Sequence, residues 1–153
     1  MSWSGTSLGM RIYRAAGGVP GSVVCLGTAL AWHHLADAVP RRVQLAVPRG
    51  SEPRRRLSIS FQVIEYDPET FTVGVSHAEP LRGADTLVTG VERTLVDAIV
   101  RRDHVREAVA REAVRRYRTR SRKWTSADRA MLFQVARMVG VEERVTEFFE
   151  STI

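Results

Sequence analysis

The chain of 153 residues is 44% hydrophobic and 26% charged, which suits one globular domain and excludes an intrinsically disordered chain. Its net charge of +6, supplied mostly by arginine, favours acidic partners, either nucleic acid or an acidic protein surface. The longest apolar run near the N-terminus, residues 23–32, is shorter than the roughly 20 apolar residues that a membrane span needs. No secretory signal pattern is recognisable. We therefore expect a cytoplasmic protein that does not act at a membrane.

Residue types that carry catalysis or bind metals are sparse. Cys25 is the single cysteine, and its apolar neighbours predict a small buried residue rather than a nucleophile. His33 and His34 are adjacent, whereas metal-binding pairs on a helix stand three or four residues apart; we expect one ring at the core edge and one in solvent. No phosphate-binding glycine loop or nucleophile-elbow pattern occurs. We expect no metal, no cofactor and no enzyme activity, and a site assembled from distant residues is the weakest alternative.

The first part of the chain predicts a loose start and then one helix. Residues 1–10 are rich in glycine and serine and are expected to be flexible, while residues 10–13 have the character of a short strand. Apolar residues recur at helical spacing over residues 26–36, and Pro40 ends this predicted helix.

Four strands are predicted in the middle of the chain, over residues 43–47, 57–64, 71–75 and 86–88. The second strand alternates most strictly, so one of its faces is expected to meet the core and the other to be solvated. Its core-facing positions are Leu57, Ile59, Phe61 and Val63. Two or more hairpins in this stretch would give a mainly antiparallel sheet.

Helices are predicted after the strands. Thr89 and Glu92 have the spacing of a capping box at the start of a helix over residues 91–99. A further helix is expected over residues 103–118, where apolar residues recur in steps of four.

Two more helices complete the prediction. Residues 125–128 resemble an N-terminal cap, and Gly140 is a natural terminator for the helix that follows them. The apolar positions of that helix are Met131, Val135, Met138 and Val139. A last helix over residues 141–149 is expected to dock back on the core. Strands followed by helices, rather than alternating with them, indicate an α+β fold, with residues 11–153 forming a single domain.

Basic clusters are the strongest functional signal. One group crowds the end of the predicted helix over residues 103–118 and the loop after it, and the others precede the strand over residues 43–47 or flank the turn that follows that strand. We predict that they contact nucleic-acid phosphates or an acidic partner, with Tyr117 and Trp124 as stacking or anchoring residues. A solvated face is the alternative, because cations favour helix C-termini. The candidate residues are Arg41, Arg42, Arg49, Arg54, Arg55, Arg56, Arg115, Arg116, Arg118, Arg120, Arg122 and Lys123.

Three stretches, in order and spacing, resemble a known family. Residues 26–35 (LGTALAWHHL) match its "serine/alanine-leucine–x–histidine–x–leucine" helix, and residues 40–50 (PRRVQLAVPRG) match a strand ending in a Pro-Arg-Gly turn. Residues 88–97 (VTGVERTLVD) match a helix start that carries Glu-Arg-Thr-Leu-x-Asp, which is the most specific of the three. The chain from Arg11 onwards resembles the C-terminal domain of AbiEi-type antitoxins of type IV toxin–antitoxin, abortive-infection systems.

The resemblance implies a phage-defence antitoxin that neutralises a toxin of nucleotidyltransferase fold, by binding or by antagonism. Full-length relatives usually begin with a winged helix-turn-helix that binds operator DNA, and we expect no such domain before Arg11. A DNA-binding transcriptional regulator with an arginine-rich surface is the alternative function.

The family motif also has a simple structural explanation, since Thr89 and Glu92 would cap the helix and Arg93 with Asp97 would form an ion pair worth about 0.2–0.5 kcal/mol. The motif residues are Glu92, Arg93, Thr94, Leu95 and Asp97.

Overall fold

The computed structural model describes residues 7–120 and 125–152, and every structural statement below concerns these residues. The strands are β1 (Val23–Val24), β2 (Val43–Pro48), β3 (Phe61–Tyr66), β4 (Val75–Leu81) and β5 (Ala84–Thr89). The helices are α1 (Leu8–Gly18), α2 (Leu26–Trp32), α3 (Val91–Val100), α4 (Glu107–Thr119), α5 (Ser126–Val139) and α6 (Glu142–Ser151). The predicted α+β class, with a helical cluster after the strands, is confirmed.

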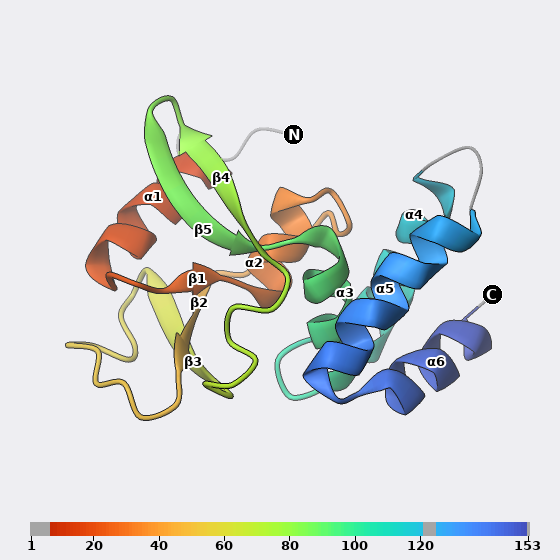
Figure 1. The fold of residues 1–153 in the computed structure, drawn as a ribbon. Coiled ribbons are helices and arrows are strands. Elements are labelled where there is room, and N and C mark those ends of the chain that lie inside the picture. Colours follow the sequence, from red (N-terminus) through yellow and green to blue (C-terminus); the bar gives the residue numbers. More distant parts are fainter. Residues whose placement is uncertain (1–6, 121–124, 153) are drawn as a thin grey trace.

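The five strands form one sheet in the order β3-β2-β1-β5-β4. Antiparallel pairing joins β1 to β2 and β4 to β5, and β4 with β5 is the hairpin that projects from the sheet in Figure 1. Parallel pairing joins β1 to β5 and β2 to β3. The sequence predicts two or more hairpins in this stretch, and β2 with β3 is not one of them. Residues 49–60 must therefore return from the end of β2 to the start of β3.

Helix α1 covers one face of the sheet. Its buried residues Leu8, Ile12 and Ala15 are spaced as one helical face. They pack in one cluster with Val43, Leu45 and Val47 of β2, and with Val24, Phe61 and Val88 from the neighbouring strands. The β2 residues alternate along the strand, as expected for side chains that share one face of a sheet.

The opposite face of the sheet meets the C-terminal helices. Ala46, Ile64 and Tyr66 belong to a second core cluster, which contains the buried residues of α3, α4, α5 and α6. Figure 1 shows these four helices gathered on the far side of the sheet from α1. Both faces of β2 and β3 are thus covered, which leaves the loops and the outer helix surfaces for partners.

The prediction of a strand near residues 10–13 was wrong. These residues lie in α1, whose first turn is capped by the Ser7 hydroxyl, which accepts a hydrogen bond from the Met10 amide at 3.1 Å. Leu8, Gly9 and Met10, at the end of the segment predicted to be flexible, lie in this helix, and residues 1–6 lie outside the described residues. Burial of one face of α1 against the sheet stabilises the helix more than the local strand propensity of these residues opposes it.

The strand predicted over residues 57–64 begins only at Phe61. The Ser58 hydroxyl accepts hydrogen bonds from the amides of Ser60 and Phe61, so the chain turns just before the strand. Residues 71–75 form turns up to the start of β4 at Val75, instead of the third predicted strand. Leu57 and Ile59 are exposed in the first of these places, whereas Phe71 and Val75 in the second pack against the core without forming the predicted strand.

Helix ends follow the sequence closely in the last part of the chain. Thr125 and Asp128 form a capping box at the start of α5, and Gly140 ends that helix in the left-handed conformation with φ 85°. Val145, Phe148 and Phe149 of α6 are buried, as predicted. The capping box predicted for Thr89 is not formed, because the N-cap of α3 is Gly90 and Thr89 lies in β5.

Cys25 lies fully buried between β1 and α2, in agreement with the prediction of a small core residue. Burial raises the pKa of its thiol to about 12, although a hydrogen bond with Tyr66 acts in the opposite direction. At pH 8 the native protein should therefore carry roughly a thousandfold less thiolate than an exposed cysteine.

We expect a thiol reagent such as 5,5′-dithiobis(2-nitrobenzoic acid) to label Cys25 at pH 8 only after unfolding in guanidinium chloride, because the native thiol is both neutral and inaccessible. Absorbance at the wavelength of the released thiolate measures the rate. Rapid labelling of the native protein would contradict the buried position.

Candidate partner-binding surface

The family motif on α3 forms a buried polar network. Arg93 donates through Nε to both carboxylate oxygens of Asp97, at 3.0 and 3.1 Å, and both side chains are 2% exposed. Nη1 of the same side chain donates to the main-chain carbonyls of Thr70 and Val73 at 2.7 and 2.8 Å. Arg93 therefore fastens the segment between β3 and β4 to α3, because its bonds to the two carbonyls join that segment to the helix.

Tyr66 completes the network from β3. Its hydroxyl donates to Asp97 at 2.9 Å, and its ring lies beneath the guanidinium carbons of Arg93 and Arg101, at 5.3 and 4.0 Å. Asp97 thus receives hydrogen bonds from a strand and from its own helix. The predicted ion pair exists, but in the interior and not on a helix surface, where the estimate of a few tenths of a kcal/mol applies.

The other motif residues also have partners within the fold. The Thr89 and Thr94 hydroxyls lie 2.6 Å apart, and Thr94 donates to the Thr89 carbonyl at 2.9 Å. Glu92 accepts a hydrogen bond from the hydroxyl of Tyr117 on α4 at 3.1 Å. Tyr117 is buried, so the stacking role predicted for it is contradicted by the packing. Hydrogen bonding and packing account for each of these residues without a ligand.

The arginines of α4 are largely engaged inside the molecule. Arg116 holds Asp37 with two hydrogen bonds, at 3.1 and 2.8 Å, and Arg115 pairs with Glu112. Arg118 donates to the carbonyls of Phe149 and Thr152 at the end of α6. Such bonds hold α6 and the loop after α2 against α4.

Arg120 is exposed at the end of α4. Arg122, Lys123 and Trp124 lie outside the described residues. The basic tract predicted after α4 is therefore represented in the structure mainly by arginines that already serve the fold.

The other predicted arginines gather beside β2 and β3. Arg42 donates to the Ser58 carbonyl at 2.9 Å, and Arg56 pairs with Glu65 of β3 at 3.5 Å. These contacts hold the C-terminal part of the segment 49–60, which we call the arginine loop, next to β2 and β3. Four exposed arginines here make no side-chain hydrogen bond or ion pair with the described residues: Arg41, Arg49, Arg54 and Arg55.

Apolar side chains are exposed in the same loop. Ile59 is 91% exposed and Leu57 is 58% exposed, although the alternating pattern predicted that both would face the core. Large aliphatic residues at such exposure lose the free energy that burial would give, about 1.5–3 kcal/mol for each side chain. An adjacent pair of apolar side chains among unpaired guanidinium groups is characteristic of the centre of a protein interface.

Helix α5 carries a second exposed apolar face. Met131 and Met138 are each 56% exposed, whereas Leu132 and Ala136 are fully buried. Of the four apolar positions predicted for this helix, Val135 packs against the core and Val139 is half-buried, whereas the two methionines are exposed. The sequence could not separate them, because apolar residues of α5 surround most of its circumference. Methionine stripes of this kind occur at adaptable binding surfaces.

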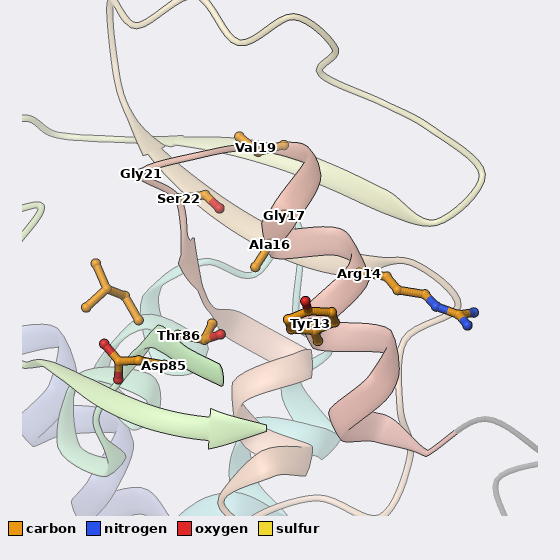
Figure 2. Close-up of a pocket in the computed structure, with 10 residues that line it drawn as sticks. Tyr13, Arg14, Ala16, Gly17, Val19, Gly21, Ser22, Asp85 and Thr86 are labelled. Atoms are coloured by element: carbon orange, nitrogen blue, oxygen red, sulfur yellow. The ribbon is translucent and has the colours of Figure 1, made fainter. Parts of the chain in front are cut away.

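A hollow of about 420 Å³ lies between α1 and β5. The Ser22 hydroxyl on its wall is buried and has no hydrogen-bond partner among the described residues. Figure 2 shows Arg14 extending away from the other labelled side chains, and Asp85 and Thr86 both line the hollow. Asp85 already bonds His77 at 2.8 Å. The described lining residues include no paired nucleophile and base of the kind that catalysis requires.

Histidines and acidic residues are dispersed over the described residues, and no group of three or more of them could hold a metal ion. His33 lies at the core edge, where its Nε2 donates to the Thr89 carbonyl at 2.7 Å, and His34 is exposed, as expected for this pair. Burial lowers the pKa of His33, which favours the neutral ring. Within the described part of the chain, none of the helices is long and apolar enough to cross a membrane.

No protein-family model matches the chain, and comparison with curated proteins gives no significant match. Functional assignment therefore rests on the residues and geometry described above.

The buried network yields a stability prediction. Asp97→Ala should lower the free energy of unfolding by about 3–5 kcal/mol, because Arg93 would remain buried without its counterion. Urea denaturation followed by circular dichroism measures the change. Glu142→Ala is the matched control, since it breaks the exposed pair with Arg137 and should scarcely move the midpoint. Equal effects of the two substitutions would contradict the assignment.

Two glycines with positive φ provide a second test. Gly140→Ala should cost about 1–2 kcal/mol through backbone strain alone, because a Cβ there meets open space. Gly74→Ala should cost distinctly more, since its φ is 68° and its Cβ would lie 2.7 Å from the Cβ of Arg93. Thermal unfolding of both variants would compare them, and similar losses would show that Gly74 is not packed against Arg93.

Proposed function

We propose that this protein is an antitoxin-like binding protein of the AbiEi type, which acts in the cytoplasm without catalysis and uses the arginine loop to engage an acidic partner protein. The partner implied by the family resemblance is a toxin of nucleotidyltransferase fold. The observation that carries the proposal is the position of Ile59, 91% exposed in a loop with unpaired arginines.

Charge in this region favours an acidic partner. Between residues 41 and 65 the chain has six arginines and two glutamates, Glu52 and Glu65, and no lysine or aspartate. Unpaired guanidinium groups attract carboxylates over long range and can bind them in a bidentate manner at contact. Arginine is also among the residues that contribute most to protein interfaces.

The two apolar side chains add a feature that phosphate binding does not need. Leu57 and Ile59 would gain free energy only by burial against a partner's apolar surface, whereas a nucleic-acid backbone offers charge and sugar. Leu57 is tied to β3 by a bridge with Gln62, so the loop presents its apolar residues from a fixed base. The combination favours a protein partner over DNA.

DNA binding by a transcriptional regulator remains the second candidate, because the same arginines could contact phosphates. Engagement of Arg116 and Arg118 within the fold reduces the basic surface that this function would require at α4. The two functions differ in their dependence on salt and on Ile59.

We expect the wild-type chain to restore growth to cells that express the toxin encoded beside it, and Ile59→Ser to abolish this rescue by removing apolar contact. The double variant Arg54→Gln with Arg55→Gln should also lose rescue. Arg14→Gln with Arg82→Gln is the matched control, because it removes two exposed arginines outside the loop and should retain rescue. Soluble expression of every variant would be checked by immunoblotting.

The alternative outcomes are distinct. DNA binding that falls steeply with salt and with loss of Arg54 and Arg55, yet is unchanged in Ile59→Ser, would replace the antitoxin proposal with DNA regulation. Absence of both rescue and DNA binding by the wild-type chain would refute both candidate functions.

A further inference from the structure

Three arginines that the sequence analysis did not single out surround a hollow on the helical cluster. The hollow has a volume of about 400 Å³ and lies where the end of α3 meets α4 and α6. Figure 1 places these helices on the other side of the molecule from the segment 49–60, so the hollow is separate from the arginine loop. Its lining residues are Ile99, Arg102, Arg111, Arg144, Glu147, Phe148 and Ser151.

Two of the guanidinium groups converge on one aromatic ring. Their central carbons, in Arg102 and Arg111, lie 5.1 and 4.3 Å from the centre of the Phe148 ring, which is itself buried. Both side chains also donate to the carboxylate of Glu107, at 2.7 and 3.1 Å. The shared ring and the shared carboxylate hold the two cations close together, although like charges repel.

Bonds to the fold fix each arginine before any ligand arrives. Arg102 donates to the Ile99 carbonyl at 3.2 Å, and Arg144 donates to the Val100 carbonyl at 3.0 Å, so both cap the end of α3. Arg111 donates to the hydroxyl of Thr152 at 2.7 Å. A guanidinium group held in this way loses little conformational entropy when it binds a further partner.

Donors remain on all three groups. Among the described residues, no side-chain or main-chain acceptor lies within hydrogen-bond distance of Nη2 of Arg102, Nη2 of Arg111, or Nη1 and Nε of Arg144. These donors come from three separate elements. A ligand that uses them together needs at least three acceptor oxygens in a compact, three-dimensional arrangement.

We propose that this hollow is a binding site for a phosphate group, either inorganic phosphate or the terminal phosphate of a small phosphomonoester. Phosphate presents oxygens in several directions and bears a charge of about −1.5 to −2 near neutral pH, whereas a carboxylate has only two coplanar oxygens. Glu107 already supplies such a carboxylate to Arg102 and Arg111. The donors that remain on the three arginines come from separate elements, and the several directions of phosphate oxygens suit them better than a second planar carboxylate. The site is independent of the antitoxin proposal.

Acidic residues limit the expected affinity. Glu107 neutralises part of the charge of Arg102 and Arg111, and Glu147 lines the hollow itself. A phosphate dianion in the hollow would be repelled by Glu147, so the charge of that residue should weaken binding. We expect dissociation constants of about millimolar or somewhat below, as is usual for a small ligand at a half-open surface site.

The test titrates inorganic phosphate into the full chain at low ionic strength and pH 7.5, and follows amide chemical shifts by nuclear magnetic resonance. Saturable shifts should centre on Ile99, Arg111 and Ser151. Arg144→Gln should weaken binding by about tenfold or more, through loss of one charged donor. Glu147→Gln should tighten it several-fold, and this opposite change cannot arise from unfolding.

Two controls keep the result specific to the hollow. Arg14→Gln removes an exposed arginine on α1 that has no side-chain partner among the described residues, and it should leave the phosphate affinity unchanged. Glucose 6-phosphate is the second titrant, and it distinguishes a site for phosphomonoesters from a site that binds only inorganic phosphate. Binding of inorganic phosphate or of glucose 6-phosphate supports the proposal. No saturation at phosphate concentrations well above the expected dissociation constant, equal binding of acetate, or equal weakening by Arg14→Gln would overturn it.

Discussion

Arg93 and Asp97 are paired one helical turn apart in α3, and they sit at the junction of the sheet with the helical cluster. Neither charge is stable in the interior without the other, since each would have to leave water unpaired. Their further bonds reach the carbonyls before β4 and the hydroxyl of Tyr66 on β3. The pair therefore positions α3 against the sheet, and α4, α5 and α6 pack on the frame that results.

This arrangement decides which basic residues are available to partners. Because Arg116 and Arg118 hold neighbouring segments against α4, most of the charge described there is used within the fold. The arginine loop lies at the edge of the sheet formed by β3, because the parallel pairing of β2 with β3 requires a long segment that returns to the start of β3. Because the arginine loop is long and mostly polar, most of its side chains do not pack in the core. Its arginines without a partner among the described residues, together with Ile59, form the surface on which the proposed antitoxin function depends.

Sequence reasoning succeeded where local chemistry dominates. The Thr125 capping box and the Gly140 terminator were predictable because a hydroxyl three residues before a carboxylate and a glycine after an apolar run each satisfy helix-end groups locally. It failed for residues 57–60, whose alternation resembles a strand although Ser58 turns the chain. The prediction for α5 was correct for Val135 and wrong for Met131 and Met138, since several faces of that helix are apolar.

The sequence by itself determined the α+β class, the burial of Cys25, and the candidate family motif, because composition, order of elements and residue spacing are local properties. Only the tertiary structure decided that Arg93 and Asp97 are interior and that Arg54 and Arg55 are unpaired. It alone brought Arg102, Arg111 and Arg144 around one hollow. The reason is physical: burial and pairing depend on which distant segments meet, and those contacts are made by packing that one-dimensional spacing does not encode.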